Sequence, residues 1–276
     1  MRWIVLFIIA WCIVGLAFAG IVSANADEFD SLGIRHSSNP TVCIFEPHPL
    51  FTDDQSGIIN VSYNAINLWK DKMYEHMPNG DWEMPTHLID IEDHHTKNAL
   101  QFPACNIMIS FEYVNEEASS LGYTGIMFNK SSHKFTHIVV FTHDLRVTTH
   151  FEFDLTKLDH EEVRTSINIT PHSLTAIQNI ITHEFGHGLG LGHYKITDYP
   201  VYPKDTPWLD ASVMYYSMNP EHTGVMIPTY VDIKMVEMIY GTDGFGGEIT
   251  PPFKTGYYQG GDDDICTHKC SIIPRR

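Results

Sequence analysis

The chain has 276 residues, of which 43% are hydrophobic and 12% aromatic, and 34 acidic against 17 basic residues give a formal net charge of -17. This composition excludes wholesale disorder, and the length suits one medium domain with appendages. The acidic balance argues against nucleic-acid binding, which requires clustered lysines and arginines.

The first 26 residues have the form of an export signal. Trp3 to Val22 is an uncharged apolar run, and Ala24-Asn25-Ala26 has the small-x-small pattern of a signal peptidase site. A run of about 20 residues is also long enough to span a bilayer. Residues 1–26 are therefore predicted to be a signal peptide or an N-terminal membrane anchor. The charges that flank the run predict an extracellular protein, either secreted or tethered through residues 3–22.

The elements expected after this leader alternate between strands and helices. A strand is predicted at Thr41–Pro47, and helical spacing of apolar residues predicts a helix from Asp54 to Met77. Four further strands are expected at "THLIDI", "CNIMISFEY", "GYTGIMF" and "HIVVFT". A second helix is expected to start near Thr170-Pro171, and a third, "VDIKMVEMIYG", to end at Gly241. This order predicts an α/β fold with layer packing.

Three stretches show no clear element. Residues 144–169 and 194–211 have no assignable period, and residues 242–276 are rich in Gly, Pro and Asp. The last stretch is predicted to be an irregular tail with a cysteine pair. Its run Asp262-Asp263-Asp264 is either a Ca²⁺ site or a solvated acidic run.

Four cysteines remain beyond the leader: Cys43, Cys105, Cys266 and Cys270. In an exported chain they indicate two disulfides, and three connectivities are open. Cys43 and Cys105 could bridge adjacent strands, while "CTHKC" could close a small loop. Half of a metal site is the alternative for "CTHKC", but no second cysteine pair completes four thiolates.

The stretch "HEFGHGLGLGH", from His183 to His193, has metal-ligand spacing. On a helix, His183 and His187 lie on one face and point two imidazoles at one cation, while Glu184 projects beside it as a general base. Gly190 can adopt positive φ, end the helix and let His193 reach the same metal. Three neutral imidazoles and one open position are typical of catalytic zinc.

The extended pattern HExxHxxGxxH resembles the zinc signature of the metzincin metallopeptidases, and "ASVMYYS" is similar to the methionine turn of that clan. The wording "SVMY", the helix "VDIKMVEMIYG" and the strand "CNIMISFEY" look like the matrixin branch. The resemblance implies a catalytic domain over residues 41–241. That domain would have a twisted, mostly parallel five-stranded sheet with an antiparallel edge strand, an active-site helix and a C-terminal helix. Met214 would then lie beneath the histidines as an apolar floor.

Several features depart from the matrixin pattern. The segment between His193 and Met214 is longer than matrixins usually allow, and Tyr216 stands where they place a proline. Astacin-like and serralysin-like relatives have a tyrosine there that steadies the oxyanion. Tyr216 is thus either catalytic or a buried core tyrosine. The cysteine-switch peptide and the structural zinc loop of vertebrate matrixins are both missing.

These patterns predict a monomeric, zinc-dependent metalloendopeptidase that acts on extracellular proteins or peptides. One Zn²⁺ is expected on His183, His187 and His193, with Glu184 as the base, and the substrate is expected along a strand edge near residues 122–128. Two alternatives remain: a catalytically idle, membrane-tethered zinc-binding surface protein, and a hydrolase of a non-peptide amide or ester.

Overall fold

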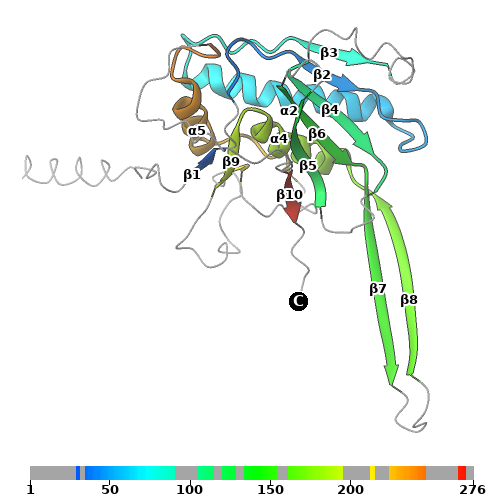
Figure 1. Cartoon of the computed structure of the whole chain (residues 1–276). Coiled ribbons are helices and arrows are strands. Elements are labelled where there is room, and N and C mark those ends of the chain that lie inside the picture. The colour runs from blue at the N-terminus through cyan, green and yellow to red at the C-terminus, as the bar shows by residue number, and fades with distance from the viewer. Residues whose placement is uncertain are drawn as a thin grey trace, which may run out of the picture.

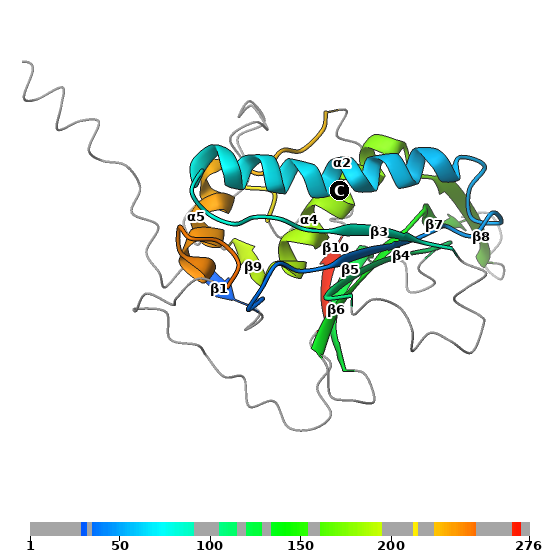
Figure 2. The same ribbon diagram turned by 90° about the horizontal axis from the view of Figure 1, so that it is seen from above.

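The structure is a computed structural model that describes residues 29–31, 35–90, 105–114, 120–128, 134–153, 161–194, 212–214, 224–246 and 267–271. Within these residues the fold is α/β, as predicted. Helices α2 (Gln55–His76) and α4 (Leu174–Gly188) lie against one face of a mixed sheet, and α5 (Tyr230–Tyr240) lies at one end of the molecule (Figures 1 and 2).

The main sheet has the strand order β10-β5-β6-β4-β2-β3. Strands β3, β2, β4 and β6 are parallel to one another, and β5 is antiparallel to β6. These five strands form the mostly parallel sheet that was expected, and each falls on a predicted strand. Their bounds are Val42–Phe45 (β2), Thr86–Ile89 (β3), Ile107–Glu112 (β4), Ser120–Phe128 (β5) and Lys134–Phe141 (β6).

The sixth strand, β10 (Thr267–Ser271), differs from the prediction in two ways. It lies within the stretch expected to be an irregular tail, and it pairs antiparallel with β5. The antiparallel strand β5 is therefore not the edge of the sheet. The reason is that β5 offers β10 a row of backbone donors and acceptors that β6 does not use.

Helices α2 (Gln55–His76) and α5 (Tyr230–Tyr240) lie where they were predicted. Asp54 caps α2, because its carboxylate accepts a hydrogen bond from the Gly57 N–H at 2.8 Å. Helix α5 ends at Gly241, whose φ of +75° favours glycine.

Helix α4 (Leu174–Gly188) begins later than expected near Thr170-Pro171. Pro171 still belongs to β8 (Glu161–Pro171), where it pairs with His143 of β7. Ser173 is the residue that caps the helix, accepting a hydrogen bond from Ala176 N–H at 3.1 Å.

Strands β7 (His143–Phe153) and β8 fall mostly in the stretch 144–169 that had no predicted element. They form an antiparallel hairpin that extends away from the rest of the molecule (Figure 1). Because a two-stranded ribbon buries little on either face, Val147 and Ile167 remain 52% and 67% exposed.

The fold also takes in residues on both sides of the predicted domain 41–241. Strand β1 (Phe29–Ser31) pairs with β9 (Leu191–Tyr194), and the Arg35 guanidinium donates to the Ile239 carbonyl at 3.1 Å. At the other end, Phe245 is buried in the main core, and Asp81 pairs with Gly244.

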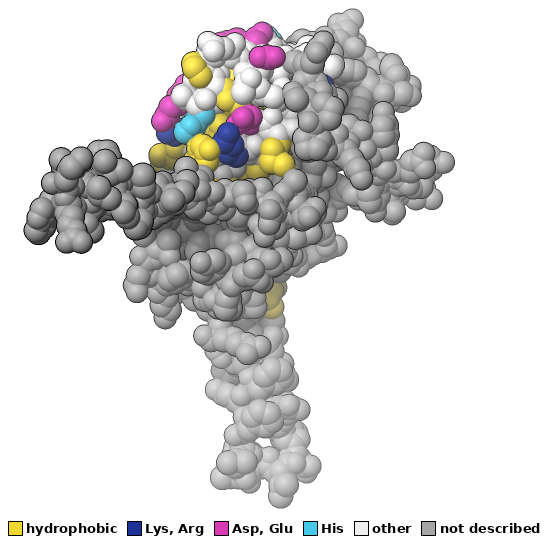
Figure 3. Space-filling model, turned by 90° about the vertical axis from the view of Figure 1, so that its left-hand side faces the viewer, with side chains coloured by type: hydrophobic (Ala, Val, Ile, Leu, Met, Phe, Trp, Pro, Cys, Tyr) yellow, Lys and Arg dark blue, Asp and Glu magenta, His cyan; other side chains and the backbone are white. Residues whose placement is uncertain are grey.

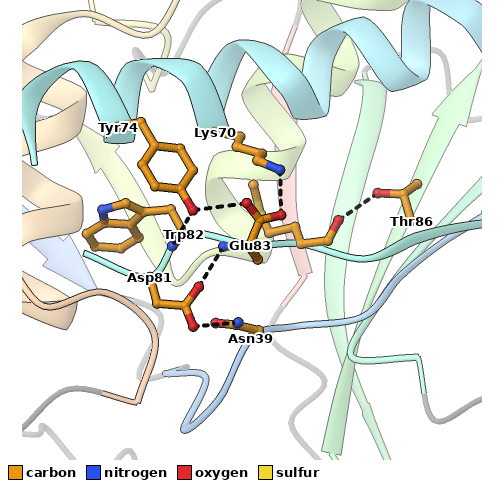
Figure 4. A network of polar contacts seen from close by, with 8 residues as sticks. Asn39, Lys70, Tyr74, Asp81, Trp82, Glu83 and Thr86 are labelled. Carbon is orange, nitrogen blue, oxygen red and sulfur yellow. Dashed lines mark hydrogen bonds and ion pairs between the residues drawn. The ribbon is translucent and has the colours of Figure 1, made fainter. Parts of the chain in front are cut away.

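A polar network attaches the segment between α2 and β3 to α2 (Figure 4). The Glu83 carboxylate accepts from Lys70 Nζ at 2.6 Å and from the Tyr74 hydroxyl at 3.0 Å. Trp82, which is fully buried, donates its Nε1–H to the Met77 carbonyl at 3.0 Å. The network fixes the entry into β3, the strand at one edge of the sheet.

The end of the molecule formed by α5 combines apolar and charged side chains (Figure 3). There Tyr230 contacts the His76 ring at the end of α2, with ring centroids 5.6 Å apart, and Lys234 lies 5.6 Å from the Tyr230 ring centroid. These contacts join α2 to α5.

Among the helices that the structure describes, none is long and apolar enough to cross a membrane.

Cys43 on β2 and Cys105, just before β4, form a disulfide between neighbouring strands. Cys270 lies in β10, and Cys266 lies outside the described residues. The pairing of those two cysteines stays a prediction.

Candidate metal centre

Helix α4 presents His183 and His187 from within the protein core. Every residue of the helix from Ala176 to Gly188 is buried, and Ile177, Ile180 and Ile181 pack in the main core. Trp69 of α2 donates its Nε1–H to the Thr182 carbonyl at 2.8 Å, next to the first histidine. The two histidines are therefore carried by a helix that has little freedom to move.

A tight turn after α4 brings the third histidine back. Gly190 has a φ of +96°, a left-handed conformation that side-chain-bearing residues rarely adopt. Beyond it the chain enters β9, and the Leu191 carbonyl accepts from His187 Nδ1 at 2.7 Å. This turn places His193 opposite the helix face that carries His183 and His187.

The three imidazoles converge on one point. His193 Nε2 lies 3.3 Å from His183 Nε2 and 3.2 Å from His187 Nε2. The ligand atoms of the triad all lie within 4.8 Å of one another, and the three residues are buried. Nitrogens bound to a tetrahedral zinc at about 2.0–2.1 Å lie roughly 3.3–3.4 Å apart, so the spacing fits such an ion.

Hydrogen bonding of the other ring nitrogens supports the same conclusion. His183 Nδ1 lies 2.6 Å from the Val213 carbonyl, and His187 Nδ1 lies 2.7 Å from the Leu191 carbonyl. A carbonyl only accepts, so both Nδ1 atoms carry the proton and both Nε2 atoms of the neutral rings present lone pairs. Both lone pairs lie within 3.3 Å of His193 Nε2, which carries at most one proton and can donate to only one of them. A cation between the three nitrogens satisfies all of them, and carbonyl partners are typical of metal-bound histidines.

A buried carboxylate supports the first histidine indirectly. Asp232 of α5 accepts from the Ser212 hydroxyl and from the Val213 N–H at 3.1 Å, and the Val213 carbonyl holds His183. Burial raises the pKa of Asp232, while the hydrogen bonds from Ser212, Thr229 and Val213 oppose that rise. Helix α5 and the turn at 212–214 thus form one unit behind the metal site.

Met214, the predicted floor of the site, is fully buried and packs against α4 at Gly186. A Cβ at position 186 would lie 2.2 Å from the Met214 sulfur and 2.9 Å from the Trp69 ring. Gly186 lies between the two helical histidines in sequence. The glycine therefore lets Met214 approach the helix backbone next to the candidate metal ligands.

Glu184 is fully buried and faces β5. The Thr124 hydroxyl lies 2.6 Å from Glu184 Oε2, and a Cβ at Gly122 would lie 3.4 Å from Glu184 Cγ. Charge-assisted hydrogen bonds of this length are strong, so Thr124 fixes the orientation of one carboxylate oxygen.

Sequence reasoning predicted a substrate edge near residues 122–128, but it missed the contacts of Thr124 and Gly122 with Glu184, and it missed Asp232. The helix "VDIKMVEMIYG" was predicted, but the partners of its aspartate were not. Alternation along "GYTGIMF" places Gly122 and Thr124 on one face of the strand, and this is the signal that could have grouped them.

Some predicted residues cannot be placed. Tyr216, Cys266, Asp262–Asp264, residues 1–26 and residues 195–211 lie outside the described part of the chain. The catalytic role of Tyr216, the calcium alternative and the leader stay predictions.

No protein-family model matches the chain, and no curated protein matches it in sequence. The candidate site is therefore supported by the residue pattern and by the geometry above.

Proposed function

We propose that the protein is an exported, zinc-dependent metalloendopeptidase of the metzincin type. The observation that carries the proposal is the convergence of three histidine Nε2 atoms, with Nε2–Nε2 distances of 3.2 and 3.3 Å, beside a buried glutamate. His183, His187 and His193 would hold the ion. A donor set of three imidazoles without a thiolate favours catalytic zinc over structural zinc.

When bound, Zn²⁺ supplies Lewis acidity, which polarises a scissile carbonyl and acidifies a water. The protein residues then have distinct tasks. Glu184 accepts the proton of the attacking water and delivers it to the leaving amine. Thr124 holds one oxygen of that carboxylate at 2.6 Å and so orients the other for proton transfer. Asp232 and Val213 keep the His183 ring in the tautomer that offers Nε2.

Glu184 also separates this proposal from an idle zinc-binding protein. Burying a carboxylate is costly unless it is paired or hydrogen-bonded, and a purely structural site would not need this group beside the triad. A general base adjacent to the ligands supports hydrolysis. The acyl group is assigned by resemblance to the metzincins, and the experiment below tests it.

The test uses the purified full-length chain and its Glu184→Gln variant. We expect one tightly bound zinc in both proteins, measured by elemental analysis. The wild type should cleave casein and a peptide library, and a zinc chelator should stop the cleavage. Glu184→Gln should lower the rate by roughly 10²–10⁴-fold, the typical contribution of general-base catalysis.

Absence of zinc from the folded wild type would contradict the metal site. Zinc binding without any cleavage of peptides would favour the idle zinc-binding protein. Cleavage of only ester or non-peptide amide substrates would favour a hydrolase of such compounds. Mass spectrometry of the mature N-terminus tests export, since cleavage after Ala26 removes the leader and an intact leader indicates an anchor.

A further inference from the structure

One face of β5 lies directly against the candidate catalytic residues. Thr124 of β5 binds the Glu184 carboxylate, and Gly122 lies against Ile180 and Glu184. The inner edge of β5 is fully used by β6, from the pair Gly122–Val140 to the pair Phe128–Lys134. A peptide that approaches Glu184 by strand pairing therefore has only the outer edge available in the described sheet.

That outer edge is taken by the chain itself. Strand β10 pairs with it in antiparallel register, with Thr267 opposite Gly125, His268 opposite Thr124 and Lys269 opposite Tyr123 (Figure 1). Adjacent strands lie about 4.8 Å apart, so the backbone of β10 runs one strand spacing from the strand that contacts the base.

We propose that residues 267–271 are an intramolecular occupant of the peptide-binding edge of β5, and that they restrain access of substrates to the metal site. The restraint of substrate access rests on the proposed function, whereas the pairing of β10 with β5 does not depend on it. A backbone N–H or C=O of β5 that bonds β10 cannot bond a second peptide, so the tail and an extended substrate exclude one another.

Tethering makes such a strand an effective competitor. Residues 247–266 join β10 to the body that ends with the buried Phe245 and its neighbour Gly246. Because β10 is covalently joined to the rest of the chain, its pairing with β5 is intramolecular, and its effective concentration at that edge is of the order of millimolar. A weak strand pairing is therefore enough to keep the edge filled until a substrate or a partner displaces it.

The test compares the full-length wild type with two double variants. His268→Pro with Lys269→Pro removes both amides, and because successive amides of a strand alternate in direction, one of them points at β5. His268→Ala with Lys269→Ala is the matched control, since it keeps both N–H groups. All three proteins should bind zinc equally, which verifies that the body is folded.

Two measurements decide the outcome. Hydrogen exchange at residues 120–125 should be faster in the proline variant than in the wild type, and unchanged in the alanine control. Peptide cleavage should rise by about tenfold or more in the proline variant only, because a millimolar internal competitor is lost. Equal protection in all three proteins would overturn the pairing, and faster exchange with an unchanged cleavage rate would overturn the restraint.

A third measurement keeps the inference separate from the proposed function. For this measurement alone, each of the three proteins additionally carries Glu184→Gln, so that the peptide is not cleaved. Fluorescence anisotropy follows the binding of a labelled synthetic peptide of residues 263–273 in which both cysteines are replaced by serine. The peptide should bind the proline variant at least about tenfold more tightly than the other two proteins. If none of the proteins that retain Glu184 cleaves peptides but this difference in peptide binding is found, the peptidase proposal fails and the filled edge stands. Equal binding, or no binding to any of the three, overturns the filled edge.

Discussion

The candidate metal centre and the β7–β8 hairpin are neighbours in sequence but differ in the contacts that hold them together. His172 and Ser173 alone separate β8 from α4. The centre gathers residues from β5, α4, β9, the turn at 212–214 and α5, and each of its histidines is buried. The hairpin is stabilised by the antiparallel pairing of its own two strands, and Val147 and Ile167 are more than half exposed. Function that depends on fixed geometry is thus located where many elements meet, and changes there should cost far more than changes in the hairpin.

Loss of a metal ligand should produce the largest effect. We expect His193→Ala to weaken zinc binding by more than the roughly 10–100-fold typical of losing an outer partner, and to abolish cleavage. Val147→Ser together with Ile167→Ser in the hairpin is the matched comparison and should leave zinc affinity unchanged. Competition with a fluorescent zinc chelator measures both. A hairpin variant that loses zinc would show that the two regions are coupled.

Asp232→Asn should have the next largest effect. The amide keeps the shape of the carboxylate, but its NH₂ group replaces one acceptor oxygen and faces either the Ser212 hydroxyl or the N–H groups of Val213 and Thr229, depending on its orientation. We expect zinc affinity to fall about 10–100-fold, because the carbonyl that orients His183 moves. Thermal unfolding should also occur at lower temperature. Asp243→Asn, at an exposed position, is the control. Equal behaviour of the two variants would contradict the supporting role of Asp232.

Gly186→Ala tests the close approach of Met214 to α4. The added Cβ would lie 2.2 Å from the Met214 sulfur, so the turn at 212–214 or the helix must shift. Overpacking of this kind typically costs about 1–3 kcal/mol of unfolding free energy. Gly125→Ala on β5 is the matched control, because nothing lies within 4 Å of its added Cβ. Chemical denaturation of the zinc-loaded proteins gives both values, and equal stabilities would contradict the close approach.

The same contrast explains what could be predicted from the sequence. Metal ligands have fixed types and spacings, so "HEFGHGLGLGH" indicates its chemistry without knowledge of the fold. The five strands and three helices were predicted because their apolar residues recur with clear periods. The hairpin was missed although Leu145 and Val147, and likewise Ile167 and Ile169, alternate with polar residues, because threonines at positions 149 and 165 break each apolar series. The stretch between its strands, residues 154–160, contains no Gly or Pro to mark a turn.

The contacts between distant segments could not be predicted for a different reason. The pairing of β10 with β5 and the bond from Thr124 to Glu184 join residues far apart in the chain. Neither leaves a local pattern, because strand pairing depends on backbone groups that every residue has and a threonine on a strand is ordinary. Only the assembled sheet identifies them.

Thr124→Val should affect catalysis more than folding. Valine keeps the shape of threonine but removes the hydroxyl that lies 2.6 Å from Glu184 Oε2. We expect kcat to fall about tenfold, the free-energy equivalent of one modest hydrogen bond, with KM and zinc content nearly unchanged. Thr124→Ser restores the hydroxyl and should recover most of the rate. A serine variant as slow as the valine variant would assign Thr124 a packing role only.

The smallest expected effect lies at the base of the hairpin and depends on pH. His172 has a buried Nε2 without a hydrogen-bond partner in the described part of the chain, and burial lowers its pKa below the usual 6.5. The folded state therefore favours the neutral ring. As pH falls below about 6.5, the unfolded chain takes up the proton first, so the free energy of unfolding decreases until the lowered pKa is passed.

The stabilising contribution of neutral His172 is complete above pH 6.5 and is lost on acidification. Any zinc held by the histidine triad would also be released on acidification, so the informative quantity is the difference in the free energy of unfolding between the wild type and His172→Gln. We expect this difference to change between pH 7.5 and 5.5 in urea denaturation. Hydrogen exchange of the hairpin amides next to residue 172 should follow it, whereas amides of α4 near His187 should not. A difference that is constant across this range would mean that the His172 ring is equally easy to protonate in the folded and unfolded states, and would remove this residue from the account of acid sensitivity.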